Sequence, residues 1–358
     1  MVDAAALRAE FPVLADQAYL NAGTFGPLPH AVVRAELDVL DHAAAEGRFR
    51  GYFELKMELA GRQRAAYAAL LGADAEDVAL TTCTSEGVVR VLAGLDLGPG
   101  DEILTAPDEH PGLLGPLGGL RARRGVEVRT APFAELADAI GPRTRLVACS
   151  HVNWVTGALR PAGLAEADVP VLLDGAQGIG AVSADVRELG CIFYAGSGQK
   201  WLCGPAGTGM LWIEPAWRDR VTPLGTTYLN LAEPGAALDS PPQPDARRHD
   251  APAIATETHA AAVAAHDVLA AHGWPAVQAR AADLAAELAD RLAESGRTVA
   301  PRGRTTLVTW EQPEPEETRT RLAAAGVIIR DVPGTPYVRA SVGAWNDQAD
   351  LDRLLAAL

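Results

Sequence analysis

Short apolar runs alternate with amphipathic segments through much of the chain. Between about residues 77 and 213, amphipathic stretches such as SEGVVRVLAGL and HPGLLGPLGGLRARRG predict helices. Seven runs rich in Val, Ile, Leu and Thr predict strands: DVALTTC, DEILTAP, VEVRTAP, TRLVACSHV, PVLLDGA, IFYAGS and GTGMLWI. This alternation is the pattern of βαβ units, so we expect an α/β domain built on a mostly parallel sheet.

The pattern changes after this region. Residues 214–250 include the proline-rich run PPQPD and are expected to form a connection. Two alanine-rich helices, broken at Gly273, Trp274 and Pro275, are followed by predicted strands and helices in TTLVTWE, PEETRTRLAAAG, VIIR, YVRASV and DQADLDRLLAAL. We therefore predict a large α/β domain over residues 17–245 and a smaller α+β domain over residues 246–358, which includes residues 1–16.

Composition and charge exclude several classes of protein. The 358 residues are 48% hydrophobic and carry a net charge of −15, which is typical of a globular protein and unfavourable for binding nucleic acid or an anionic membrane. The chain does not open with a basic segment followed by a long apolar one, and no later apolar run approaches membrane-spanning length without a charge. The sequence therefore predicts a cytoplasmic protein.

The cysteines give no sign of a metal site or a disulfide framework. Cys83, Cys149, Cys191 and Cys203 are scattered singly, and no histidine cluster has metal-ligand spacing. We expect them to be reduced and buried, and we expect no bound metal.

Polar residues follow several predicted strands, at the edge of an open α/β sheet where ligands bind. Thr84, Ser85 and Glu86 open a helix after DVALTTC, where free backbone N–H groups form an anion site, although an ordinary N-cap would look the same. His110 follows DEILTAP, and its ring is either a stacking partner for a planar ligand or simply solvated. These positions favour an anionic, planar ligand without establishing one.

Two further strand ends carry chemistry. Asn153 and Trp154 follow TRLVACS, and Asp174 leaves the apolar run PVLL. A buried carboxylate there requires a cation or strong donors, because an unpaired charge is costly to bury. The sheet edge is therefore expected to gather acidic, amide and aromatic groups.

Lys200 stands in the glycine-rich, apolar segment GSGQKWLCGPAGTG. Desolvation lowers the pKa of an amine, and a neutral amine attacks a carbonyl to form a Schiff base; the alternative is a surface lysine whose stem packs on the protein. An anion cradle, a stacking ring, a buried acid and this lysine together make a pyridoxal phosphate site, in which the acid keeps the pyridine nitrogen protonated.

The chain resembles the fold-type I, class V pyridoxal phosphate enzymes, a group that includes cysteine desulfurases, selenocysteine lyases, kynureninases and isopenicillin N epimerase-like proteins. The resemblance covers essentially the whole sequence: YLNAGTFGPLP, TTCTSEG, DEHPG, SHVNWVTGALRP, VLLDGAQGIGAVSADVRELG, YAGSGQKWLCGPAGTGMLWI and YVRASVGAWNDQADLDRLLAAL. It implies a large domain with a mostly parallel seven-stranded sheet and a smaller C-terminal α+β domain.

The resemblance also implies a role for each matched position in cofactor binding. Lys200 would form the Schiff base and shuttle protons, Asp174 would pair with the pyridine nitrogen, Gln177 would bond the ring hydroxyl and His110 would stack on the ring. The other implied cofactor contacts are Ser85, Ser197 and Gln199 on the phosphate, the backbone around Thr84 and Glu86, and Asn153.

Substrate contacts are implied as well. Arg339 would clamp the substrate α-carboxylate in a bidentate manner, Asn21 would face the same carboxylate, and Trp154 would narrow the pocket or stack on a bulky substrate. The family forms homodimers whose sites borrow residues from the partner, and residues 225–227 and 248–252 fall where those residues lie. Within the second segment Ala-Pro replaces the usual Gly-Thr.

Departures from the family bear on the reaction. Cysteine desulfurases use a thiol on a loop near the C-terminus, whereas here only residues 331–336 separate Arg330 from Tyr337, and no cysteine follows Cys203. Gln199 replaces a common histidine, and Trp154 replaces an asparagine near the ring hydroxyl. We regard Cys203 as a packing residue, and the short 331–336 loop predicts a more open site.

These features favour a carbon–sulfur β-lyase acting on a cysteine S-conjugate or sulfoxide, because a β-thiolate or sulfenate leaves without help from an enzyme thiol. The alternatives are a class V aminotransferase or amino-acid epimerase, then a cysteine desulfurase, and finally a non-catalytic scaffold. Retention of Lys200, Asp174, Gln177 and Arg339 together argues against the scaffold.

Overall fold

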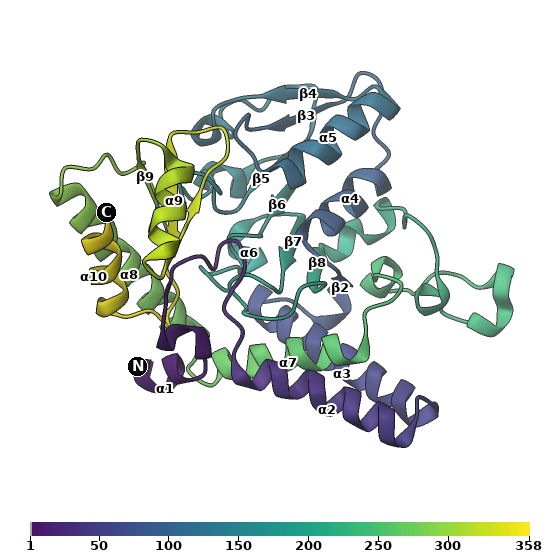
Figure 1. The fold of residues 1–358 in the computed structure, drawn as a ribbon. Helices are drawn as coiled ribbons and strands as arrows, with labels where there is room; N and C mark the ends of the chain where they lie inside the picture. The colour runs from purple at the N-terminus through teal and green to yellow at the C-terminus, as the bar shows by residue number, and fades with distance from the viewer. Residues whose placement is uncertain (1) are drawn as a thin grey trace.

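A seven-stranded sheet forms the centre of the computed structural model, which describes residues 2–358 (Figure 1). All seven predicted strands are present, in the order β2-β8-β7-β6-β5-β3-β4. Only β8 runs antiparallel to its neighbours. The strands are β2 (Val78–Thr81), β3 (Glu102–Thr105), β4 (Glu127–Thr130), β5 (Thr144–Ser150), β6 (Val171–Asp174), β7 (Phe193–Ser197) and β8 (Gly209–Ile213). The predicted α/β class is confirmed.

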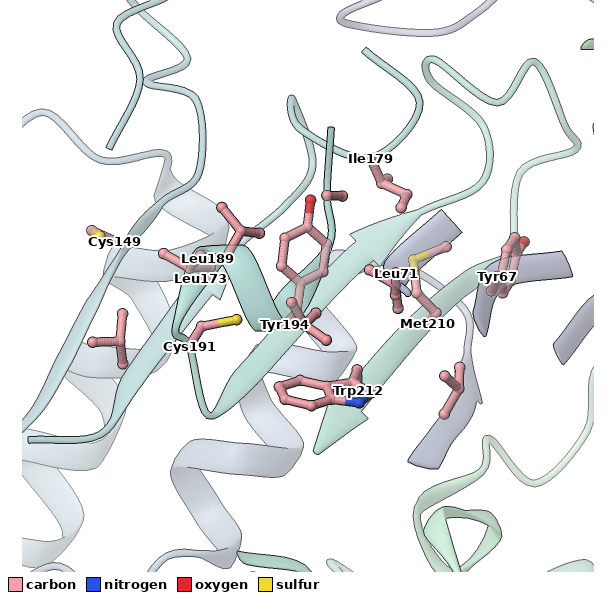
Figure 2. Close-up of a cluster of buried hydrophobic side chains, with 14 of the residues drawn as sticks. Tyr67, Leu71, Cys149, Leu173, Ile179, Leu189, Cys191, Tyr194, Met210 and Trp212 are labelled. Atoms are coloured by element: carbon pink, nitrogen blue, oxygen red, sulfur yellow. The ribbon is translucent and has the colours of Figure 1, made fainter. Parts of the chain in front are cut away.

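Apolar side chains cover both faces of this sheet. Strand residues alternate between the faces, so Ala79 and Ile103 join one buried cluster while Leu80 and Leu104 join the other. Helices α4 (Thr84–Gly94) and α5 (Pro111–Arg124) pack on the first face. The second face, drawn in Figure 2, receives α3 (Arg50–Leu71) and the short α6 (Val186–Leu189).

A second, smaller sheet lies towards the C-terminus. Its order is β11-β12-β9, all antiparallel, with β9 (Leu307–Glu311), β11 (Arg330–Asp331) and β12 (Tyr337–Ser341). Helices α8 (Trp274–Glu294), α9 (Pro315–Ala324) and α10 (Gln348–Ala357) surround it.

The predicted strand VIIR is in fact two strands. Val327–Ile328 (β10) pairs in parallel with Ala18–Tyr19 (β1), whereas Arg330–Asp331 pairs antiparallel with β12. The chain changes partner at Ile329, which is buried between the two pairings. A single periodic run therefore serves two sheets, and the N-terminal strand is fixed beside the small sheet.

Three helices form a layer outside the large sheet. Helix α7 (Thr256–Ala270) packs against α2 (His30–Glu46) and α3. The domain boundary predicted at residue 245 remains a prediction. Helix α7 follows this boundary in the sequence, but its main helix contacts are with α2 and α3, which precede the boundary. Residues 214–250 contain only short 3₁₀ turns and extend outward in Figure 1.

No helix within residues 2–358 combines the length and the apolar character needed to cross a membrane.

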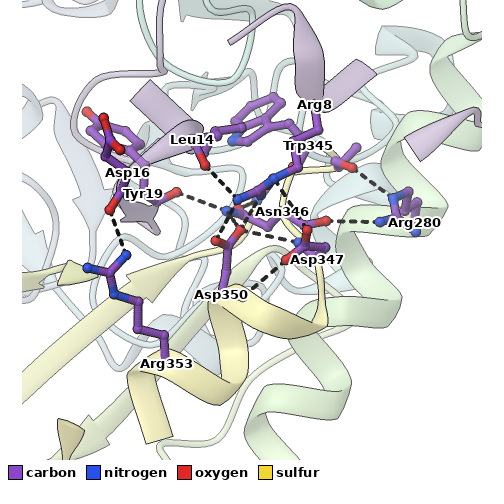
Figure 3. Close-up of polar contacts among 12 residues, drawn as sticks. Arg8, Leu14, Asp16, Tyr19, Arg280, Trp345, Asn346, Asp347, Asp350 and Arg353 are labelled. Carbon is purple, nitrogen blue, oxygen red and sulfur yellow. Dashed lines mark hydrogen bonds and ion pairs between the residues drawn. The ribbon is translucent and has the colours of Figure 1, made fainter. Parts of the chain in front are cut away.

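The N-terminal helix is fixed to the C-terminal one by a single arginine (Figure 3). Arg8, on α1 (Ala4–Ala9), donates from Nη1 to Asp350 Oδ2 over 2.7 Å and from Nη2 to the Leu14 carbonyl over 2.8 Å. Asp350 is buried on α10 and also accepts from Asn346 Nδ2 over 2.8 Å. This contact joins residues separated by most of the chain.

Replacing Arg8 with Met should destabilise the protein by about 2–4 kcal/mol, because the buried Asp350 carboxylate would lose its cation. The free energy of unfolding in urea measures this. Arg50→Met is the matched control, since the Arg50–Glu54 pair is exposed and should contribute little. Equal losses for the two variants would contradict the buried-pair explanation.

Candidate active site

A cavity of about 230 Å³ opens at the carboxyl ends of the parallel strands, where a ligand was expected. It lies beside the ends of β6 and β7 and the first turn of α4. The predicted residues that line it are Thr84, Ser85, His110, Trp154, Asp174, Gln177, Ser197, Gln199 and Lys200. The structure therefore brings together side chains that are scattered over more than a hundred positions of sequence.

Lys200 follows β7 within this cavity. The pKa of its amine is lowered to about 8, mainly by burial and also by Arg339 and Arg330, while Asp174 acts in the opposite direction. A substantial neutral fraction is therefore present near pH 8, and the neutral amine is the nucleophilic form. The direction agrees with the expectation from the glycine-rich setting of the lysine.

Asp174 ends β6 and is buried. Its Oδ1 accepts from the Ala176 N–H over 3.0 Å. Burial raises the pKa of this carboxyl, while the hydrogen bond and the Lys200 charge act in the opposite direction. An acid in this setting is poised to accept a strong donor such as a protonated ring nitrogen.

His110 is held in a neutral form. Its Nδ1 accepts from the Gly112 N–H over 2.9 Å, which caps α5 and leaves the other ring nitrogen to carry the proton. Burial, together with Lys200, Arg330 and Arg339, lowers the pKa of His110 to about 4. A neutral ring on a fixed helix start is suited to contact the face of a planar ligand.

Trp154 forms one wall of the cavity beside His110. The two ring centroids lie 5.0 Å apart at 86°. The indole Nε1 donates to the Asp108 carbonyl over 2.8 Å, which fixes the orientation of the ring.

The anion cradle is formed where β7 meets α4. Ser197 Oγ accepts from the Thr84 N–H over 3.0 Å and lies 2.6 Å from Thr84 Oγ1, so the strand end and the helix start are tied together. Gln199 Oε1 is buried without a partner. The first turn of α4 adds the positive end of its dipole.

Gln177 is oriented by contacts at both ends of its amide. Nε2 donates to the Gly23 carbonyl over 2.8 Å, and Oε1 accepts from Trp201 Nε1 over 3.0 Å. The amide retains one N–H and one lone pair for a ligand hydroxyl. Its predicted contact to the ring hydroxyl remains a prediction.

Arg339 lies fully buried behind the cavity wall. Nη1 donates to the Trp154 carbonyl, whereas Nε and Nη2 have no protein partner. Burial and Arg330 lower its pKa to about 9. A buried guanidinium with open donors is suited to bind a carboxylate at two points. Nη2 lies 3.0 Å from where a Cβ on Gly23 would stand, so only glycine leaves this approach open.

Besides Arg339, three predicted residues do not line the cavity with their side chains. Glu86 accepts from the Thr82 N–H over 2.6 Å and pairs with Arg90, so only its backbone remains for a phosphate. Asn153 Oδ1 accepts from the Thr156 N–H over 2.9 Å and holds its own loop. Asn21 lines an adjacent cavity of about 520 Å³. Their predicted ligand contacts remain predictions.

Residues that the sequence did not single out also face the cavity. Arg330 lines it, lies 5.7 Å from the Trp154 ring centre and also lines the adjacent cavity. The sequence signal that could have identified Arg330 was its charge at the end of the apolar run VIIR. The other members of this set are Gly23, Thr24, Phe25, Cys83 and Ala176. Cys203, by contrast, is fully buried and absent from the lining.

These groups fit pyridoxal phosphate. A partly neutral amine, a buried acid, the helix N-terminus at the start of α4, and an arginine with open donors are the complements of an aldehyde, a ring nitrogen, a phosphate and an amino-acid carboxylate. When bound, this cofactor supplies an electron sink for bonds broken at the substrate Cα.

Known structures have the same overall fold. The cystine C–S lyase C-DES, in complex with its reaction product cysteine persulfide, gives a TM-score of 0.90 at 26% identity and covers 97% of this chain and 98% of its own. A mutant of C-DES with glycine covalently linked to the pyridoxal phosphate cofactor gives 0.90 at 25% identity, with 98% of both chains covered. The cysteine desulfurase CsdA of Escherichia coli gives 0.87 at 27% identity, covering 100% and 98%.

Sequence relatives agree with this assignment. A probable cysteine desulfurase of Methanothermobacter thermautotrophicus is 32% identical over 256 residues, which is 66% of this chain and 63% of that protein. The isopenicillin N epimerase of Streptomyces clavuligerus is 31% identical over 354 residues, 91% of this chain and 84% of that protein. Residues 18–354 match the family described as aminotransferase class V. The chain therefore belongs to the class V aminotransferase family of pyridoxal phosphate-dependent, fold-type I enzymes.

Proposed function

We propose that this enzyme is a carbon–sulfur β-lyase that acts on cysteine S-conjugates, including disulfides and sulfoxides. The observation that carries the proposal is the loop between β11 and β12. It spans only Val332–Pro336 and contains no thiol. A sulfur leaving group that departs on its own needs no such thiol, whereas attack on the substrate sulfur requires one.

The side chains around the cavity divide the work of this reaction. Arg339 binds the substrate α-carboxylate through Nε and Nη2, which orients Cα. Lys200 then removes the Cα proton as a general base, since its amine is partly neutral at pH 8. With the cofactor bound, Asp174 would stabilise the protonated ring nitrogen, and His110 would lie beside the ring without adding charge.

Substrate size and charge follow from the second arginine. Arg330 lies between the 230 Å³ cavity and the adjacent 520 Å³ cavity. An S-conjugate with a distal carboxylate can place its amino-acid end on Arg339 and its distal end on Arg330. Cystine, the substrate named for C-DES, has this form.

An epimerase is the second candidate. The isopenicillin N epimerase relative matches over 91% of this chain, more than the desulfurase relative does. Epimerisation uses the same removal of the Cα proton by Lys200 and differs in the delivery of a proton to the opposite face of Cα. Product analysis therefore separates the two reactions.

The lyase should release pyruvate from cystine, S-carboxymethylcysteine and cysteine sulfoxides. Lys200→Ala should abolish the release, and Arg339→Lys should lower kcat/KM by about 100-fold, because an ammonium cannot make the planar two-point contact. Coupled pyruvate detection and chiral chromatography of residual substrate provide the measurement. Inverted substrate without pyruvate would replace the lyase with the epimerase.

Cys83→Ser is the control that separates a lyase from a thiol-dependent desulfurase. Cys83 is the one cysteine that lines the cavity within residues 2–358. A lyase should keep its kcat on S-carboxymethylcysteine within about threefold, because no enzyme thiol takes part. With L-cysteine as substrate, loss of turnover together with loss of persulfide formation would favour the desulfurase.

The lowered pKa of Lys200 predicts a pH dependence that is measurable without substrate. In cofactor-free protein, Lys200 should become half-reactive towards an amine-directed acylating reagent near pH 8, since deprotonation creates the nucleophile. An unperturbed lysine reaches this point only near pH 10.4. The chain contains only one other lysine, Lys56, so peptide mass spectrometry resolves both. A midpoint above pH 10 for Lys200 would refute the prediction.

We also propose that the enzyme is a homodimer. Helices α2 and α3 expose apolar side chains at helical spacing, each between 42% and 66% exposed: Val33, Leu37, Leu40, Phe49, Phe53 and Met57. Stripes of this kind on two adjoining helices are typical of subunit interfaces. The interface would also bring the borrowed residues expected from the family resemblance near a partner site.

The double variant Leu37→Glu, Phe53→Glu should shift the protein from dimer to monomer, because both charges would be buried at the interface. Light scattering after size exclusion gives the mass. Leu159→Glu is the control, since Leu159 is also exposed but lies outside α2 and α3. A wild-type monomer, or a dimer that survives the double variant, would contradict this interface.

A further inference from the structure

Four polar side chains meet inside an otherwise apolar layer between the large sheet and α7. Gln63 and Tyr67 come from α3, His259 comes from α7, and Thr208 directly precedes β8. Each is at most 3% exposed. Tyr67 also belongs to the apolar cluster of Figure 2, packed with Leu71 and Met210. Polar groups in such a place are costly unless they are bonded to one another.

Hydrogen bonds link three of these side chains, and the fourth lies beside them. His259 Nδ1 lies 2.6 Å from Gln63 Oε1, and Gln63 Nε2 donates to Tyr67 OH over 2.9 Å. Tyr67 OH and Thr208 Oγ1 both lie against Gly198, and Thr208 Oγ1 donates to the Pro205 carbonyl over 2.7 Å. These polar groups thus run from α7 through α3 to the loop that follows β7.

The direction of the bonded part is fixed by the Gln63 amide. Its N–H donates to the Tyr67 oxygen, so its carbonyl oxygen faces His259. Gln63 Oε1 then accepts from His259 Nδ1–H. Burial, with Lys56 and Arg64, lowers the pKa of His259 to about 4, so the ring stays neutral above pH 5 and the direction persists.

These polar side chains end beside Gly198 and Thr208, at the base of the loop that carries Lys200. The Gly198 N–H donates to the Thr208 carbonyl over 2.9 Å, and the Gly204 N–H donates to the Gly198 carbonyl over 3.0 Å. A Cβ on Gly198 would lie 2.2 Å from Thr208 Oγ1 and 2.9 Å from Tyr67 OH. The side chains of Tyr67 and Thr208 therefore contact the backbone at Gly198, two residues before Lys200.

We propose that His259, Gln63, Tyr67 and Thr208 form a positioning network that sets the backbone of residues 198–208 and thereby the place of the Lys200 amine. None of the four lines the cavity, so they act through the loop and not on the cofactor. An apolar layer would pack here without them, whereas buried polar groups that must satisfy one another restrict the geometry of the loop that they contact. The proposal rests on the assignment of Lys200 as the cofactor lysine, and not on which product forms.

Tyr67→Phe tests the network, because it removes one hydroxyl and keeps the ring. The holoenzyme is titrated with acid and base while the visible absorption band of the lysine-bound cofactor is followed. We expect the midpoint to move by at least about 0.5 pH unit and cofactor release to rise by at least about fivefold, as the amine loses its fixed position. His259→Leu should give the same changes by interrupting the chain from α7.

Two variants separate positioning from a general loss of stability. His259→Asn keeps a donor near the position of Nδ1 and should restore the wild-type midpoint. Arg8→Met loses stability at the opposite end of the sequence and should leave the midpoint unchanged. Hydrogen exchange of residues 198–208 should increase in Tyr67→Phe and His259→Leu only.

The outcomes are distinct from those that test the proposed reaction. The network would be overturned if both Tyr67→Phe and His259→Leu kept the wild-type titration midpoint, the wild-type rate of cofactor release and the wild-type hydrogen exchange. Should Tyr67→Phe fail to fold, His259→Leu decides alone. Borohydride reduction of the wild-type holoenzyme, followed by peptide mapping, identifies the labelled lysine. A label absent from Lys200 would overturn the assignment on which the network rests, whereas an epimerase product would leave the network intact.

Discussion

Uncompensated positive charge is the constraint on which the site depends. Arg330 and Arg339 lower the pKa of Lys200, Arg330 lowers that of Arg339, and all three cations lower the pKa of His110. Within residues 2–358, Asp174 is the one carboxylate that raises the pKa of Lys200. Burying such an excess is costly unless an anion completes the set. The phosphate of the cofactor and the carboxylates of the proposed substrate would supply that charge.

Residues from both sheets position these cations. Lys200 follows the large sheet, whereas Arg330 and Arg339 sit opposite each other on neighbouring strands of the small one. The N-terminal loop passes between them, and its Gly26 N–H donates to the Gln199 carbonyl over 2.8 Å. A Cβ on Gly26 would lie 2.1 Å from the Lys200 carbonyl, so glycine is needed where this loop crosses the lysine loop. The geometry of the cations is therefore set by contacts that are remote in sequence.

Because the site depends on contacts between segments that are remote in sequence, only part of it could be predicted from the sequence. Periodicity identified all seven strands of the large sheet, and the rule for strand ends placed Asp174 and Lys200 together, because both depend on local pattern. Arg330 was missed because VIIR looks like one strand, and the change of pairing partner at Ile329 is a tertiary event.

The sequence also does not reveal which hydrogen-bond partner a side chain has in the folded protein. Glu86 and Asn153 have the right side chains and the right neighbourhood, yet both are taken up by nearby backbone groups. The packing of α7 on α2 and α3 is likewise decided by which apolar faces meet in three dimensions. Residue type and position thus indicated the cofactor, while the contacts that fix it needed coordinates.

The electrostatics of the cavity also bear on how a sulfur group departs. His110 is neutral and spends Nδ1 on the Gly112 N–H, so it is a poor acid for a leaving thiolate. Lys200, once it has taken the Cα proton, is an acid with a pKa of about 8. Ordinary thiols have a pKa near 8.5, so proton transfer from this ammonium to a departing thiolate is nearly balanced. In the proposed β-lyase, one lysine would therefore serve as base and then as acid, and the elimination would need neither a second acid nor a thiol.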